Sequence, residues 1–138
     1  MTSRMINVTC GIILKDCKIL VTQRSEKMQL ALKWEFPGGK IEPNETEEQC
    51  IHRELKEELG IEIEILEKLE PKPFHYEQFS INLIPFVATY LSGEIMLHEH
   101  KDFKWLTKEE LTALDWASAD VPVLESFLKL NYVTRGTL

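Results

Sequence analysis

Residues 39–61, "GKIEPNETEEQCIHRELKEELGI", carry the clearest structural pattern of the chain. It predicts a helix that begins after Thr46, because Thr46 and Gln49 match the capping-box pattern, in which two side chains bond each other's backbone N–H groups. Gly60 marks the expected end, since glycine readily adopts the left-handed conformation that closes many helices. The helix also carries a narrow apolar stripe at four-residue spacing, formed by Ile51, Leu55 and Leu59.

Three glutamates lie beside this stripe: Glu54, Glu57 and Glu58. At about 100° per residue they fall within about 100° of arc on a helical wheel. Like charges four residues apart destabilise a helix by roughly a few tenths of a kcal/mol. The glutamates could form a solvated face softened by Arg53 and Lys56, or they could hold hard divalent cations, which take oxygen ligands and pair with phosphates. Local spacing alone does not decide between these interpretations.

The wider pattern resembles the Nudix box. Gly39 is followed after five residues by Glu45, and after seven more by Arg53-Glu54-Leu55-x-Glu57-Glu58-x-Gly60-Ile61. Residues 23–61 are similar to the MutT branch of the Nudix hydrolases, whose members hydrolyse nucleoside triphosphates. The tail, with "HEH" at 98–100 and "SADVPVLESF" at 118–127, is most similar to CTP pyrophosphohydrolases of that branch. Asn44 departs from the glycine often found there, but asparagine tolerates a left-handed conformation.

The resemblance implies a Nudix fold, an α/β (α+β) architecture in which a mixed β-sheet lies between helices and the box forms a loop-helix-loop. It implies Mg²⁺ or Mn²⁺ as cofactor, with five ligands: the carbonyl of Gly38 and the side chains of Glu54, Glu57, Glu58 and Glu99. It further implies that Arg53 orients the carboxylates, and that the structural positions of the box are Gly39, Glu45 and Gly60.

A general base is also needed, and in MutT-like enzymes it comes from a loop that faces the helix. Glu99 is the matching residue. On an extended segment, Glu99 would point away from His98 and His100 and would face the metal alone. The alternatives are a charged turn at an edge, and a zinc pair of His98 and His100, although two ligands do not make a zinc site. If Glu99 is dispensable, the base is a glutamate of the helix.

Two basic residues are candidates for binding the substrate phosphates. Arg24 follows the second predicted strand, and the resemblance implies that it reaches the phosphates. The alternative is a single exposed arginine. Lys40, directly after Gly39, is a weaker candidate for the same role.

Asp120 occupies the place where MutT-like proteins carry an Asn or Asp that hydrogen-bonds the nucleobase. An ionised carboxylate only accepts hydrogen bonds and suits the exocyclic amine of cytosine, whereas a protonated one could donate to an oxidised purine such as 8-oxoguanine. Alternatively, Asp120 or Ser118 caps the last helix. Phe36 and Trp116 are candidate aromatic walls of the base pocket, with core packing as the alternative.

The rest of the chain predicts further strands and helices. A hairpin is expected from residues 6–15 and 18–24, joined by Asp16-Cys17. A polar connection follows at 25–33, and a loop begins at Pro37-Gly38-Gly39. More strands are expected at 61–66, 79–91 and 103–106, with Pro85 at an edge or bulge. A short helix follows Thr107, whose capping box is completed by Glu110, and a C-terminal helix covers 118–133 with Pro122 in its first turn.

Composition limits the class of protein. The 138 residues, 43% of them hydrophobic, suit one domain over residues 1–138. The net charge of −7 opposes long nucleic acid, so the expected partner is a small nucleotide, with the protein a monomer or homodimer. Three cysteines without CxxC spacing argue against a disulfide framework. We find neither a signal-peptide pattern nor an apolar run of about 18 residues, and therefore expect a cytoplasmic protein without membrane contact.

The sequence thus predicts a metal-dependent nucleoside triphosphate pyrophosphohydrolase. Water attack at the β-phosphorus would release a nucleoside monophosphate and pyrophosphate. The expected substrates are CTP, dCTP or oxidised nucleotides such as 8-oxo-dGTP, whose removal cleans the nucleotide pool. One alternative is hydrolysis of nucleoside diphosphate sugars or dinucleotides, because the box specifies only the diphosphate chemistry. Another is a non-catalytic nucleotide-binding domain, against which the three intact glutamates argue.

Overall fold

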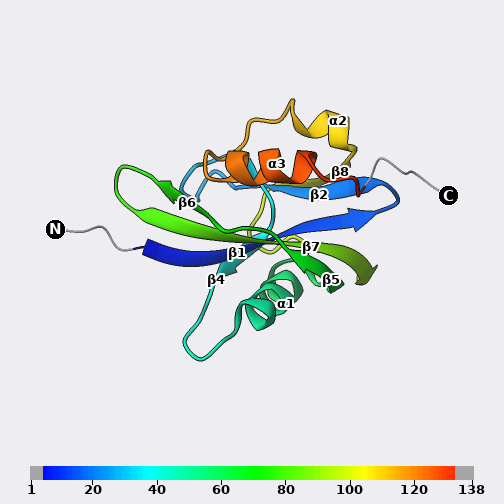
Figure 1. Ribbon diagram of the computed structural model, residues 1–138, viewed down its shortest axis with the longest axis horizontal. Helices are drawn as coiled ribbons and strands as arrows, with labels where there is room; N and C mark the ends of the chain where they lie inside the picture. The colour runs from blue at the N-terminus through cyan, green and yellow to red at the C-terminus, as the bar shows by residue number, and fades with distance from the viewer. Residues whose placement is uncertain (1–4, 133–138) are drawn as a thin grey trace.

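The computed structural model describes residues 5–132 and consists of an eight-stranded sheet between helices (Figure 1). Helix α1 (Glu47–Leu59) covers one face, while α2 (Lys108–Leu111) and α3 (Asp120–Leu128) lie on the other. The strands are β1 (Met5–Lys15), β2 (Lys18–Gln23), β3 (Trp34–Glu35), β4 (Gly38–Lys40), β5 (Glu62–Lys68), β6 (Lys72–His75), β7 (Ser80–Ser92) and β8 (Asp102–Leu106). The expected mixed sheet between helices is confirmed.

Strands β1 and β7 form the centre of the sheet. They run parallel over ten pairs, from Met5↔Ser80 to Leu14↔Thr89, whereas the other pairings are antiparallel. The main order is β3-β2-β1-β7-β5, with β4 beside β1, β6 beside β7 and β8 beside β2. Within residues 5–132, no helix is both long and apolar enough to span a bilayer.

The core has two parts because successive residues of a strand point to opposite faces. On β2, Ile19 and Val21 join the cluster beneath α3, while Leu20 between them joins the cluster over α1. The predicted apolar stripe of α1 is confirmed, since its three residues are fully buried in the second cluster: Ile51, Leu55 and Leu59.

Both predicted ends of α1 are confirmed. The Thr46 side chain accepts a hydrogen bond from the Gln49 N–H, and the Gln49 side chain accepts one from the Thr46 N–H. Gly60 closes the helix with a φ of 75°. Asn44, with a φ of 66°, adopts the left-handed conformation allowed for it.

The loop expected to begin at Pro37-Gly38-Gly39 is wrong, because Gly38–Lys40 form strand β4 against β1. A Cβ at Gly38 would overlap the Thr9 carbonyl oxygen. Glycine is therefore used here for close approach of two strands rather than for a turn.

The expectation of Pro85 at a sheet edge is also wrong. It lies in the central strand β7, paired with Cys10 of β1. On the other side, its carbonyl accepts a 2.9 Å hydrogen bond from the Leu69 N–H, between the end of β5 and the start of β6. The missing proline donor thus falls at a break between two shorter strands.

The C-terminal helix is shorter than predicted, since α3 covers Asp120–Leu128. Pro122 does lie in its first turn, as expected. Residue 133, the predicted end, lies outside the described residues. The capping box of Thr107 and Glu110 at α2 is confirmed.

The cap of α1 gives a first prediction. Thr46→Ala removes the hydroxyl that satisfies the Gln49 N–H, so the free energy of unfolding should fall by about 1 kcal/mol in urea titrations. Thr46→Ser keeps the oxygen and should retain most of that stability. Equal stabilities of the alanine and serine variants would show that the cap does not stabilise the helix.

Candidate active site

A cavity of about 630 Å³ brings together residues from distant parts of the chain. It is lined by segments of β1, β3, β4 and α1, and by the connections around residues 28–30, 76–79, 99–100 and 117–120. Nine of the residues expected to act at the site line it: Arg24, Phe36, Gly38, Gly39, Lys40, Glu54, Glu58, Glu99 and Asp120. Four other expected residues, Glu45, Arg53, Glu57 and Gly60, lie outside its lining.

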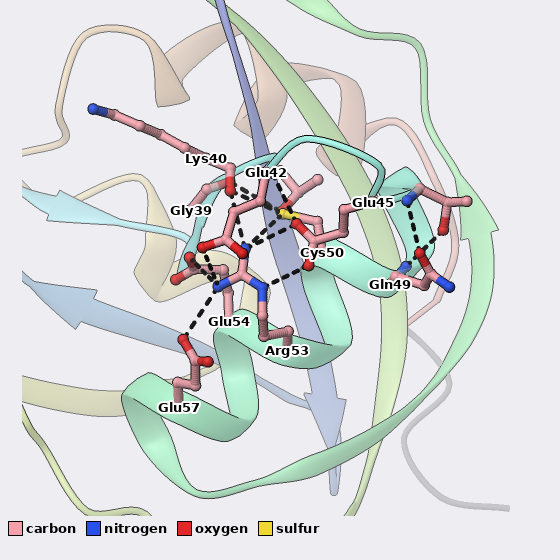
Figure 2. A network of polar contacts seen from close by, with 11 residues as sticks. Gly39, Lys40, Glu42, Glu45, Gln49, Cys50, Arg53, Glu54 and Glu57 are labelled. Carbon is pink, nitrogen blue, oxygen red and sulfur yellow. Dashed lines mark hydrogen bonds and ion pairs between the residues drawn. The ribbon is translucent and has the colours of Figure 1, made fainter.

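Arg53 is the centre of a network of polar contacts on α1 (Figure 2). Its Nε donates to Glu45 Oε2 at 2.5 Å, and its Nη1 donates to Glu54 Oε2 at 3.0 Å and to Glu57 Oε1 at 3.1 Å. Its Nη2 donates to Glu45 Oε1 and to the Lys40 carbonyl. The guanidinium therefore orients two helix carboxylates and ties them to the preceding loop.

Glu45 is held by this arginine from the loop side. Its Oε1 also accepts a 2.9 Å hydrogen bond from the Glu42 N–H. Hydrogen bonds from Arg53 lower the pKa of Glu45 from 4.5 to about 2, and the same bonds raise the pKa of Arg53. The pair is thus fixed in its charged form at neutral pH.

Glu54 lies directly over the backbone of β4. A Cβ added to Gly39 would overlap its carboxylate, which explains why the box carries glycine at this position. Burial raises the pKa of Glu54, while Arg53 opposes that shift.

Glu58 is the carboxylate outside the arginine network. Its Oε1 is buried and has no hydrogen-bond partner within residues 5–132. Burial raises its pKa, and the nearby charge of Glu99 raises it further. Because an unsatisfied buried acceptor is costly, this oxygen is suited to a cation.

The acidic residues fit a hard divalent cation in kind, since their donors are carboxylate oxygens. Within the described part of the chain, however, no three such side chains already form a metal-holding group. Glu57 is turned toward Arg53, and its side chain is 60% exposed. A site that used Glu57 as a ligand would therefore require its side chain to turn away from Arg53.

The extended geometry expected around Glu99 is wrong. Residues 98–99 form a bend, so strict alternation of side chains does not apply. Glu99 and His100 both line the cavity. His100 is buried with Nε2 2.8 Å from Glu35 Oε2, whereas His98 is exposed, so the two histidines do not form a zinc pair.

Glu35 is a cavity residue that sequence reasoning missed. Its Oε1 accepts a 2.9 Å hydrogen bond from Arg24 Nη1, while its Oε2 contacts His100. A single glutamate between two aromatic residues has no periodicity that would have singled it out. Arg24 also donates through Nε to the Gln29 carbonyl at 2.6 Å.

Asp120 lines the same cavity from the start of α3. Its Oδ2 accepts a 2.9 Å hydrogen bond from the Phe36 N–H. Burial raises its pKa well above the ordinary range, and Glu35 adds to that shift. The capping interpretation is wrong, because Ala119 occupies the N-cap and its methyl group cannot accept a hydrogen bond.

Aromatic residues surround this end of the cavity. The Tyr76 hydroxyl, also missed from the sequence, accepts a 2.9 Å hydrogen bond from the Ala119 N–H. Phe36 lines the cavity, whereas Trp116 does not. The Trp116 ring packs against the Phe36 ring, with their centroids 4.8 Å apart. The Trp116 indole donates to the Leu111 carbonyl, which supports the core interpretation of that residue.

Comparison with known proteins gives a consistent result. Residues 5–127 match the family model of the NUDIX domain. The chain is 39% identical to the CTP pyrophosphohydrolase of Escherichia coli K12, over 93% of this chain and 95% of that protein. It is 32% identical to the 8-oxo-dGTP diphosphatase of the same strain, over 92% and 99%. The solution structure of the E. coli ORF135 protein superposes with a TM-score of 0.83 at 36% identity, covering 98% and 96% of the two chains.

The lowered pKa of Glu45 gives a second prediction. Because its folded pKa of about 2 lies below the ordinary 4.5, the ion pair stabilises the fold above pH 4.5 and loses that effect as the pH falls toward 2. In urea titrations without metal, the unfolding free energy of wild type should be higher than that of Glu45→Gln. This difference should be largest at neutral pH. The difference should shrink below pH 4.5.

Glu77→Gln, which changes an exposed glutamate in the turn before β7, is the matched control. A difference for Glu45→Gln that stays constant from pH 7 to pH 3 would contradict the assignment.

Proposed function

The chain belongs to the Nudix hydrolase family, and from this premise we propose that it hydrolyses nucleoside triphosphates to a nucleoside monophosphate and pyrophosphate. The proposed substrates are CTP- or dCTP-like nucleotides or oxidised ones such as 8-oxo-dGTP. The observation that carries the proposal is one cavity lined by the box glutamates Glu54 and Glu58 and by the buried Asp120. The names of the E. coli relatives support both substrate types.

We assign the metal-binding role to five groups: the Gly38 carbonyl and the side chains of Glu54, Glu57, Glu58 and Glu99. A bound Mg²⁺ or Mn²⁺ would polarise the phosphoryl group and lower the pKa of bound water. The unpartnered Oε1 of Glu58 supports this assignment. Glu99, near enough to Glu58 to raise its pKa, is the proposed general base for water attack at the β-phosphorus.

The phosphates would be bound by Arg24 and Lys40, both of which line the cavity. The Arg24 guanidinium is held by Glu35 and by the Gln29 carbonyl, so little side-chain entropy remains to be lost when it binds a phosphate. Lys40 is exposed and can swing toward the chain of phosphates.

Asp120 would read the nucleobase. Its raised pKa supports a neutral carboxylic acid, which carries one donor and one acceptor. Such a group matches the adjacent acceptor N3 and amine N4 of cytosine, and it can also donate to an oxidised purine. Cytosine recognition therefore does not require the ionised carboxylate expected from the sequence. Phe36 would flank the base.

We further infer that residues 1–138 act as one domain in the cytoplasm, as a monomer or homodimer. The net charge of −7 opposes binding of long nucleic acid.

Hydrolysis provides the third prediction. Pyrophosphate release from CTP or 8-oxo-dGTP should require Mg²⁺ or Mn²⁺ and stop in EDTA. In ¹⁸O-water the label should appear in pyrophosphate, because the oxygen adds to the β-phosphorus. Label in the monophosphate would place attack at the α-phosphorus. Turnover of nucleoside diphosphate sugars in preference to triphosphates would overturn the substrate class.

Asp120→Asn gives the fourth prediction. Asparagine cannot ionise but keeps a donor and an acceptor, so kcat/KM should stay within about tenfold of wild type, the value of one net hydrogen bond. Wild-type activity should decline as pH rises through the elevated pKa of Asp120, while the asparagine variant should not share that decline. Asp120→Leu, which removes both groups, is the comparison. An asparagine variant as inactive as the leucine variant would show that the ionised carboxylate reads the base.

A further inference from the structure

Glu35 joins two parts of the cavity that the proposed reaction uses separately. Its carboxylate lies between the Arg24 guanidinium at 2.9 Å and the His100 imidazole at 2.8 Å. The side chains of Glu35 and His100 are only 16% and 4% exposed. The bridge therefore connects the proposed phosphate-binding residue with the residue that follows Glu99.

The connection that carries Glu99 is fixed at both ends by backbone hydrogen bonds. Met96 N donates to the Leu59 carbonyl at 3.0 Å, and Lys101 N donates to the Gln23 carbonyl at 2.9 Å. Between these anchors the chain bends at 98–99, where Glu99 is exposed. The contact of His100 with Glu35 is the side-chain anchor next to the bend.

The chemistry of this contact assigns the imidazole protons. An ionised carboxylate only accepts, so Nε2 of His100 must carry the proton that it donates to Glu35. Its Nδ1 is buried and has no partner within residues 5–132. The contact with Glu35 and the burial of His100 therefore fix the position of the residue that follows Glu99.

We propose that Glu35 and His100 are positioning residues: the bridge from Arg24 through Glu35 to His100 holds Glu99 opposite Glu58. This inference rests on the proposed function, in which Glu99 acts at the reacting centre. A misplacement of about 1 Å can reduce catalysis on the order of 100-fold. The bridge therefore acts on the rate of the chemical step rather than on recognition of the base.

His100→Asn and His100→Gln form a matched pair of tests. Both place an amide at residue 100, but only glutamine carries its donor far enough along the side chain to replace Nε2. We expect His100→Asn to lower kcat about 10- to 100-fold with KM within about threefold, and His100→Gln to retain most of the rate. Glu35→Ala should lower kcat similarly, and the double variant with His100→Asn should be no slower than the slower single variant.

Combining a bridge substitution with Glu99→Gln tests whether the bridge acts by positioning Glu99. If the bridge acts through Glu99, His100→Asn, which leaves the contact of Glu35 with Arg24 in place, should change the residual rate less than about threefold in the Glu99→Gln background. Asp115→Asn, which removes the exposed 2.9 Å ion pair with Lys33, controls for loss of a salt bridge and should leave kcat unchanged. Full additivity with Glu99→Gln, or a loss that differs between CTP and 8-oxo-dGTP, would overturn the proposal.

An NMR measurement tests the bridge without turnover. Long-range ¹H–¹⁵N spectra of wild type should show His100 protonated at Nε2. The heteronuclear NOE of the Glu99 amide should fall in His100→Asn and Glu35→Ala but not in His100→Gln or Asp115→Asn. An unchanged Glu99 NOE in both bridge-breaking variants would refute positioning, even if the enzyme proved to act on other substrates. A wild type that retains the bridge but releases no pyrophosphate would refute only the proposed function.

Discussion

The guanidinium of Arg53 lies among Glu45, Glu54 and Glu57, and the acidic helix depends on it. A planar group with five donors can bond several carboxylates and a backbone carbonyl at once, which a lysine cannot do. Repulsion between neighbouring glutamates is thus relieved within the protein, except at Glu58. The network leaves the Glu58 carboxylate with an unpartnered buried oxygen. The uncompensated negative charge of the helix therefore lies at the cavity, which Glu58 lines.

The segment of residues 34–40 supports the cavity from end to end. The Glu35 carboxylate accepts a hydrogen bond from Arg24 and contacts His100. The Phe36 N–H donates a hydrogen bond to Asp120. Gly39 leaves room for the Glu54 carboxylate. Pairing of β3 with β2 and of β4 with β1 fixes this segment in the sheet. Groups proposed to contact base, phosphate and metal therefore share one rigid backbone, which limits the errors in their relative positions.

Sequence patterns predicted those features whose causes are local. The capping boxes and the stripe on α1 each depend on residues within a few positions of one another, and the box residues come at fixed spacing. The bridge from Glu35 to His100 spans 65 residues, and the bond from Asp120 to Phe36 spans 84. Such pairs leave no local pattern. The prediction for Pro85 was wrong for a similar reason. The break between β5 and β6 that accommodates this proline exists only once both strands pair with β7.

The cavity holds two neighbouring acids in different environments, the partly buried Glu35 and the buried Asp120. The Glu35 carboxylate contacts the Arg24 guanidinium and the His100 imidazole, so both of its oxygens have partners. Asp120 receives one backbone N–H, and burial together with the charge of Glu35 raises its pKa. Because two neighbouring carboxylates cannot both ionise cheaply in a buried site, the charge of Glu35 favours a neutral Asp120, while the charge of Arg24 acts in the opposite direction. The cavity thereby keeps an uncharged hydrogen-bonding group for a base separate from the charged groups suited to phosphates and a cation.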